Sequence, residues 1–346
     1  MEFRPLRVAV GFSGALVVLG ALFWFVGFDS LGRAFAVLEP RWLLLVGLAG
    51  VAWLVSWGLA LRRVLGSLGV ETSVPRAALL FASAEFANNV TPFGQAGGEP
   101  FSALLVSRAT DTGYESGLAA VTSVDAINLV PSLVFATVGM GYYVATFTVD
   151  ADVRRVAVAV AVLAICVPLL LVLLWANRFW LERRVASGVA VATRGAAGVV
   201  PGVRPVSRAD ALSRLDVFVD ALERVGRDPR DLAVAVCFSA VGWLCMCLAL
   251  YLSVRALAVH GFPAVIALVV VPVAMLAAGL PLPGGEGGVE AALAFLLVPM
   301  ASVSPVTAVS AALVFRVGTY WLSTLLGGLA AAMLGSAVFP SGRLGN

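Results

Sequence analysis

The sequence predicts an all-α, polytopic membrane protein with about six full spans and two broken or re-entrant helical hairpins. The 346-residue chain has a mean hydropathy of +1.00, and only 12% of its residues are charged, against about 25% in soluble domains. Apolar runs of about 20 residues, enough to cross a bilayer, recur along the chain. A short motif of helix breakers and carboxylates also occurs twice inside apolar sequence.

The repeated motif reads P-F-G-Q-A-G-G-E at residues 92–99 and P-G-G-E-G-G-V-E at residues 283–290, an offset of 191 positions. Irregular backbone within a membrane is tolerated only where it is buried in protein or lines a wet cavity. Paired broken segments in two halves of a membrane protein indicate a transporter-like site. The helix-breaking residues are Pro92, Gly94, Gly97, Gly98, Pro281, Pro283, Gly284, Gly285, Gly287 and Gly288.

The elements follow from the apolar runs. Two apolar segments contain the motif and are predicted to be hairpins that return to their starting side, either re-entrant or with two full legs: 76–108 and 263–298. The first apolar run is longer than a signal-peptide core, so we predict a span there. The six predicted spans are 8–28, 42–61, 116–146, 153–176, 232–254 and 306–335.

The distribution of arginine predicts the orientation. With the N-terminus inside, 17 arginines fall on the cytoplasmic side and five outside, as the positive-inside rule requires. We therefore expect a plasma-membrane protein whose N- and C-termini are both cytoplasmic. In this orientation the first hairpin opens from the cytoplasm and the second from outside.

The chain is predicted to be one membrane domain, 1–346, built as an inverted repeat. Residues 8–146 form the first half, and residues 153–176 with 232–335 form the second. Each half has three spans and one hairpin in the same order, so the second half is inverted relative to the first.

A polar cytoplasmic linker, 177–231, joins the halves. Apolar residues at helical spacing follow Ser207-Arg208-Ala209-Asp210, which resembles a capping box. We expect an amphipathic helix that lies on the inner leaflet or on the loop ends of other helices.

Charged residues occur at membrane depth, where each costs about 2.5–3.5 kcal/mol at a helix centre. Five acids accompany one arginine, so a water-filled cavity is the simplest common explanation. Polar residues also form one stripe on the third span and another on the last span, at i, i+3 and i+4 spacing, and we expect the stripes to face each other. The stripes are Thr122, Asp125, Asn128 and Ser132, and Arg316, Thr319, Tyr320 and Ser323.

These residues define a candidate site for substrate binding or translocation. Arg316 suits a phosphate group because a guanidinium donates two hydrogen bonds at once; the alternative is a structural ion pair with Glu290 or Asp125. For Glu99 and Glu290 the alternative is helix capping beside the glycine breaks. The full set is Arg316, Glu290, Glu99, Asp125, Glu286, Glu85, Asn88, Asn89, Asn128 and Gln95.

Other classes have little support. The four cysteines lie in apolar runs and the single histidine, His260, has no obvious co-ligand, so we expect no metal and no cofactor. Catalytic motifs of the H-E-x-x-H or G-x-S-x-G type do not occur in the sequence, so we do not expect an enzyme. Nothing in the charge pattern supports nucleic-acid binding.

The runs 88–99 and 279–290 resemble the two signatures of the lysylphosphatidylglycerol synthase transmembrane-region family, also called flippase-like. The resemblance covers roughly residues 10–335. It implies a lipid-translocation module, fused to an aminoacyl-lipid synthetase in some members and associated with polyisoprenyl-linked sugars in others. The sequence ends soon after the last predicted span, so we expect a stand-alone member without the synthetase domain.

The leading hypothesis is therefore a flippase-like protein that moves a phosphate-bearing phospholipid or a polyisoprenyl-linked lipid between leaflets. The alternatives are a secondary transporter of a small soluble solute and a non-catalytic membrane scaffold. A peripheral groove open to lipid favours the first, and a closed central site favours the second. Expected partners are membrane lipids, with a separate lipid-modifying enzyme or glycosyltransferase as a further candidate; the oligomeric state is left open.

Overall fold

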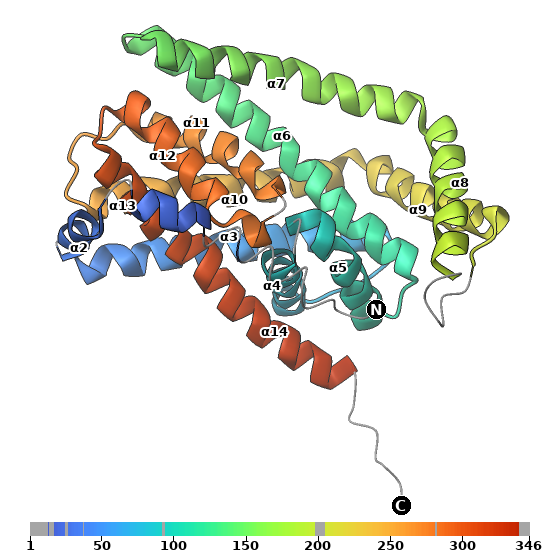
Figure 1. Ribbon diagram of the computed structural model, residues 1–346. Coiled ribbons are helices and arrows are strands. Elements are labelled where there is room, and N and C mark those ends of the chain that lie inside the picture. Colours follow the sequence, from blue (N-terminus) through green and yellow to red (C-terminus); the bar gives the residue numbers. More distant parts are fainter. Residues whose placement is uncertain are drawn as a thin grey trace, which may run out of the picture.

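The computed structural model describes residues 13, 17–24, 27–36, 38–91, 94–197, 205–280 and 282–338. Every regular element in these ranges is a helix (Figure 1). Five helices are long and apolar enough to cross a membrane, and a sixth span is reached if the bent pair 17–24 and 29–36 is counted as one. The predicted all-α, polytopic membrane class is confirmed.

The spans lie close to their predicted positions. The last span is interrupted, which the sequence reading missed: α13 (Pro305–Arg316) leads through the π-helical turn η3 (Val317–Trp321) into α14 (Leu322–Val338). Of the first predicted span, 8–28, the structure describes residues 13, 17–24, 27 and 28, and residues 17–24 are helical. The short helix α2 (Phe28–Ala36), which is bent by 84° relative to them, was not predicted. The uninterrupted spans are α3 (Pro40–Ser67), α6 (Tyr114–Thr146), α7 (Ala151–Ala176) and α10 (Pro229–Ala256).

Both predicted hairpins are present. The first consists of α4 (Val74–Val90) and α5 (Gly94–Thr110). The first leg of the second hairpin, with its 3₁₀ extension, is one apolar helix, Ala264–Gly279, and the other leg has 14 residues. Both are shorter than the roughly 17–25 residues of a spanning helix, which favours the re-entrant alternative. This second hairpin comprises α11 (Ala264–Met275), the 3₁₀ turns η1 (Leu276–Gly279) and η2 (Pro283–Gly285), and α12 (Gly288–Ala301).

The helix contacts repeat between the two halves. The central pair is α3 against α10. Around this pair, α4 contacts α14 while its counterpart α11 contacts α6, and the contact of α5 with α6 is matched by that of α12 with α13. Such an exchange of partners is what a two-fold axis between inverted repeats produces.

The central pair is closely packed because a glycine faces a tryptophan. A Cβ atom on Gly242 of α10 would lie 2.1 Å from Trp57 Nε1 of α3. The Trp57 indole N–H donates to the Ser239 carbonyl at 3.1 Å, and its ring meets that of Trp243 edge-on at 5.6 Å. These contacts hold the core against which the two hairpins are placed.

The predicted amphipathic helix of the linker is α9 (Arg208–Arg227). Its N-cap is as expected, with the Asp210 amide donating to Ser207 Oγ at 3.0 Å. It packs on α6 and on a second linker helix, α8 (Arg178–Ala197). Helix α8 was not predicted. Its buried face is made by small residues such as Ala186 and Ala190, so the sequence shows little difference in hydrophobicity between the two faces of the helix.

Candidate functional site

The loop of the second hairpin is a buried, glycine-built break. Gly284, Gly285 and Gly287 have φ angles of 54°, 65° and 82°, a region that glycine adopts without strain. Residues 283–287 are all buried. The Gly287 amide donates to Glu290 Oε2 at 2.7 Å, so the capping alternative for Glu290 is confirmed.

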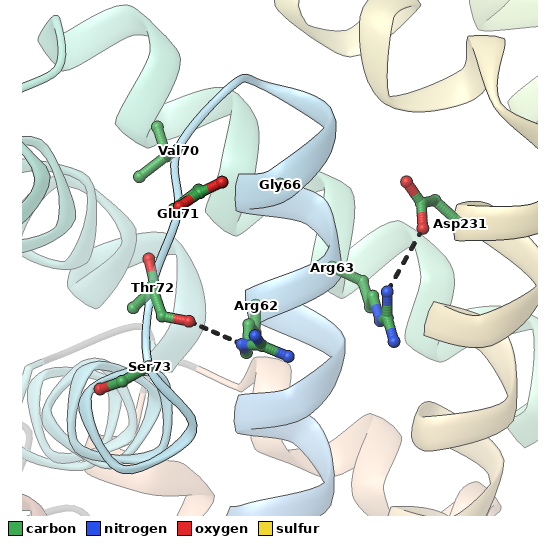
Figure 2. A pocket seen from close by; sticks show the side chains of 8 residues that line it. All are labelled: Arg62, Arg63, Gly66, Val70, Glu71, Thr72, Ser73 and Asp231. Atoms are coloured by element: carbon green, nitrogen blue, oxygen red, sulfur yellow. Dashed lines mark hydrogen bonds and ion pairs between the residues drawn. The ribbon is translucent and has the colours of Figure 1, made fainter.

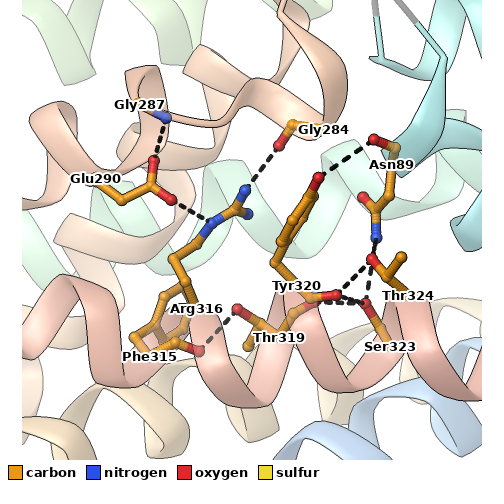
Figure 3. A network of polar contacts seen from close by, with 10 residues as sticks. All are labelled: Asn89, Gly284, Gly287, Glu290, Phe315, Arg316, Thr319, Tyr320, Ser323 and Thr324. Carbon is orange, nitrogen blue, oxygen red and sulfur yellow. Dashed lines mark hydrogen bonds and ion pairs between the residues drawn. The ribbon is translucent and has the colours of Figure 1, made fainter. Parts of the chain in front are cut away.

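Arg316 lies against this break from the last span (Figure 3). Its Nε donates to Glu290 Oε1 at 2.8 Å, and its guanidinium Nη2 donates to the Gly284 carbonyl at 2.9 Å. The guanidinium also lies 4.2 Å from the centre of the Tyr320 ring. With Arg316 5% and Glu290 3% exposed, this is a buried ion pair, and of the two expected acid partners Glu290 is the one that binds it.

The π-helical turn directly after Arg316 lies against α3. A Cβ atom on Gly50 would be 2.2 Å from the Gly318 carbonyl oxygen, and one on Gly318 would be 2.7 Å from Val46. Such π-helical insertions within α-helices are frequent at functional sites. Here the insertion sits where α3 approaches the last span most closely, immediately beside the ion pair.

The same network reaches the first hairpin through Asn89 of α4. The Asn89 side-chain amide donates to Thr324 Oγ1 at 2.9 Å and to Ser323 Oγ at 3.3 Å. The Tyr320 hydroxyl donates to the Asn89 carbonyl at 3.4 Å. A Cβ atom on Gly284 would meet both the Tyr320 ring, at 2.2 Å, and Asn89 Oδ1, at 3.1 Å. Figure 3 shows these groups joining both hairpins to the last span.

The remaining acids gather near this network. Glu99 of α5 and Asp125 of α6 lie within electrostatic range of each other. Glu85 lies within electrostatic range of both Asp125 and Arg316. Glu99 is beyond the first turn of α5, so it does not cap that helix.

Glu286 is buried in the second hairpin's loop and lies within electrostatic range of Arg316 and Glu290. Two sets of acids therefore flank the site, one on the first hairpin with α6 and one on the second hairpin. Within the described residues no three His, Cys, Asp or Glu side chains are close enough to hold a metal ion.

The two polar stripes do not face each other, and that prediction was wrong. Asn128 faces α10, where its Oδ1 accepts from Ser239 Oγ at 2.6 Å and its carbonyl accepts from the Trp243 indole at 2.9 Å. On the last span, Thr319 Oγ1 donates to the Phe315 carbonyl of its own helix. A hydroxyl that can be satisfied by the preceding turn need not face a partner helix, which periodicity alone does not reveal.

Some predicted residues lie outside the described part of the chain: Pro92, Pro281 and the side chain of Gln95. Gly94 begins α5. Gly98 is where the legs of the first hairpin cross, since a Cβ atom there would lie 2.6 Å from the Asn88 amide nitrogen.

Close approach also explains glycines of the second hairpin: a Cβ atom on Gly285 would lie 2.6 Å from Ala278 Cα, and one on Gly288 would lie 2.8 Å from the Leu280 side chain. Pro283 begins the turn η2, and its carbonyl accepts a hydrogen bond from the Glu286 amide at 3.0 Å. The sequence reading missed Thr324, although its position four residues after Tyr320 places both on one helix face.

An apolar groove of about 340 Å³ lies beside the network, between α4, α5 and α14. Phe86 and Val90 of α4, Phe101 and Leu105 of α5, and Ala331 of α14 line it. Arg108 lines it as well, near the end of α5. The groove and the Asn89 contacts share the α4–α14 interface: Val90 follows Asn89 on α4, and Ala331 lies about two turns beyond Thr324 on α14.

Two buried polar atoms near the site have no protein partner among the described residues: Asn88 Oδ1 and Asn128 Nδ2. Buried polar atoms are nearly always hydrogen-bonded, and water or a ligand supplies the partner where protein does not. Asn88 Oδ1 is consistent with hydration at the first hairpin, and Asn128 Nδ2 with hydration between α6 and α10.

The fold and site together define a multi-span helical membrane protein in which two broken hairpins enclose a buried arginine–glutamate pair. The chain belongs to the family described as Lysylphosphatidylglycerol synthase TM region, whose model matches residues 7–327. It is similar to a UPF0104 membrane protein of Methanothermobacter thermautotrophicus, 26% identical over 95% of this chain and 93% of the relative. A UPF0104 membrane protein of Pyrococcus horikoshii is 22% identical over 94% of this chain and 96% of the relative.

Proposed function

We propose that this protein moves a phosphate-bearing lipid between the leaflets of the cell membrane. The headgroup passes the polar site between the hairpins while the tails remain in the apolar groove between α4, α5 and α14. The observation that carries this proposal is that the groove and the Asn89–Thr324 contact both lie between α4 and α14. A peripheral apolar groove suits the apolar tails of a lipid, whereas a soluble solute would favour a closed central site.

Arg316 is the proposed phosphate ligand. Removing one partner of a buried ion pair costs about 3–5 kcal/mol, so Arg316 exchanges Glu290 for a phosphate oxygen rather than losing a partner. The Glu290 carboxylate keeps its bond from the Gly287 amide during this exchange. The Gly284 carbonyl holds the guanidinium in place.

The proposed activity requires no catalytic residue and no cofactor, and its partners are membrane lipids. The arginine distribution supports a cell-membrane location with both termini in the cytoplasm. The buried polar atoms Asn88 Oδ1 and Asn128 Nδ2 support a hydrated path for the headgroup.

The test is lipid translocation in proteoliposomes. Fluorescent phosphatidylglycerol and a fluorescent polyisoprenyl phosphate are reconstituted with wild type, Glu290→Gln or Arg316→Ala, and the label exposed outside is quenched over time. We expect wild type to exceed protein-free vesicles for at least one lipid, and both variants to fall to the protein-free rate. Equal rates for wild type and protein-free vesicles with both lipids would contradict the proposal.

A further inference from the structure

A second candidate site lies away from the hairpin network, at the membrane end where α3 ends and α4 and α10 begin. A cavity of about 540 Å³ there is lined by Arg62, Arg63, the 70–73 loop and Asp231 (Figure 2). A neighbouring cavity of about 600 Å³ shares Asp231 and is lined by Arg224, Arg227 and Arg230. We call the two cavities together the arginine basin.

Each of the two arginines of α3 has a protein partner, and the Arg63 side chain is also 42% exposed. Arg62 Nε donates to the Thr72 carbonyl at 2.6 Å. Arg63 forms an ion pair with Asp231 of α10 at 3.6 Å, longer than a hydrogen-bonded pair. Figure 2 shows Arg62 turned toward the 70–73 loop and Arg63 toward α10. Positioned guanidinium groups lose less freedom on binding an anion than mobile ones do.

The space beside these arginines is open. A Cβ atom on Gly66, one turn beyond Arg62 and Arg63, would meet no atom within 4 Å. The basin also carries an excess of positive charge, since five arginines and only three acids, Glu71, Asp228 and Asp231, line the two cavities.

We propose that the arginine basin binds a phosphate group at the predicted cytoplasmic boundary of the membrane. Guanidinium groups bind phosphate oxygens through paired, charge-assisted hydrogen bonds, and the ends of spanning helices lie at the depth of lipid phosphates. The shared chemistry is a phosphate monoester or diester, from a lipid headgroup or from a soluble phosphate. Phosphate binding at the arginine basin does not depend on the proposed function. Only the basin's role does: it would be the first contact for the lipid that the hairpin site then moves.

Asp231 lowers the affinity of the basin for phosphate. Its carboxylate occupies Arg63 and repels a second anion, so an incoming phosphate competes with it. Replacing it by Asn therefore strengthens phosphate binding, whereas a change that merely damages the fold weakens it. This opposite direction separates a binding site from a structural feature.

The experiment measures binding to purified protein in neutral detergent at low ionic strength, where electrostatic contacts are least screened. The probes are inorganic phosphate, dihexanoyl phosphatidylglycerol and dihexanoyl phosphatidylcholine. The variants are Arg62→Gln/Arg63→Gln, Gly66→Leu, Asp231→Asn and the matched control Arg154→Gln/Arg155→Gln, an adjacent and exposed arginine pair at the start of α7.

We expect the Arg62/Arg63 variant to lose roughly tenfold or more in affinity, the size of one to two charge-assisted hydrogen bonds. Gly66→Leu also weakens binding because its side chain fills the cavity, Asp231→Asn strengthens it, and the control matches wild type. Phosphatidylglycerol binding well above inorganic phosphate identifies a lipid headgroup as the ligand; equal binding identifies a soluble phosphate.

Two results would overturn the inference: no binding of either anionic probe, or equal losses in the Arg62/Arg63 variant and the control. The Arg62/Arg63 variant is also measured in the Arg316→Ala background, which removes the proposed phosphate ligand of the hairpin site. The loss of affinity caused by Arg62→Gln/Arg63→Gln should be the same in both backgrounds, so failure of phosphate binding at the basin is distinguished from failure at the hairpin site.

Discussion

The buried Arg316–Glu290 pair gives the sharpest prediction on stability. A buried carboxylate that loses its partner can take up a proton, whereas arginine remains charged in proteins. Glu290→Gln therefore leaves a buried positive charge and should cost about 3–5 kcal/mol. Arg316→Met leaves Glu290, still bonded to the Gly287 amide, and should cost less, about 2–3 kcal/mol for the lost bond to Gly284 and the stacking on Tyr320.

The double variant Arg316→Met/Glu290→Gln should recover much of this loss, because a buried ion pair replaced by neutral groups is often close to neutral in stability. We therefore predict an interaction free energy of about 2–3 kcal/mol between the two positions, measured as a double-mutant cycle. The assay is a reversible denaturant titration in one detergent, which gives the free energy of unfolding of each variant. Additive losses in the double variant would refute the reasoning.

Three further predictions, two on close backbone contacts and one on a helix N-cap, can be checked by the same unfolding assay. Gly284→Ala should cost about 1–3 kcal/mol because of its positive φ and the Tyr320 ring, whereas Gly279→Ala, with open space around it, should cost little; equal effects would contradict this. Gly50→Ala should separate α3 from the π-helical turn and cost about 1–3 kcal/mol, while Gly47→Ala on the same helix makes only ordinary contact and should be neutral. Ser304→Ala, which removes the N-cap bond to Thr307, should cost about 1 kcal/mol, and an unchanged midpoint would exclude a stabilising cap.

Hydropathy and helix breakers predicted most of the fold. Apart from the first span, which is only partly described, the spans and hairpins lie close to their predicted bounds because a bilayer demands about 20 apolar residues per helix. The glycines of residues 283–290 do break the second hairpin. The π-helical turn after Arg316 was missed, because one extra residue in a helix leaves no break in hydropathy.

The site was predicted less completely than the fold. The pairing of Arg316 with Glu290 was one of two alternatives, since a lone buried arginine needs an acid but spacing does not identify which one. The contact between Asn128 and Ser239 was not foreseen, because it depends on which helices become neighbours in three dimensions. The groove between α4, α5 and α14 could not be predicted, since it is formed by residues far apart in the chain.

The most direct test of lipid movement along the groove compares two substitutions on α14. Ala331→Phe fills the groove, and Leu329→Phe adds the same ring to an exposed, lipid-facing position of the same helix. In proteoliposomes with fluorescent phosphatidylglycerol or polyisoprenyl phosphate, we predict that Ala331→Phe reduces translocation at least tenfold while Leu329→Phe retains the wild-type rate. Equal rates for the two variants, with both proteins folded, would contradict lipid movement along the groove.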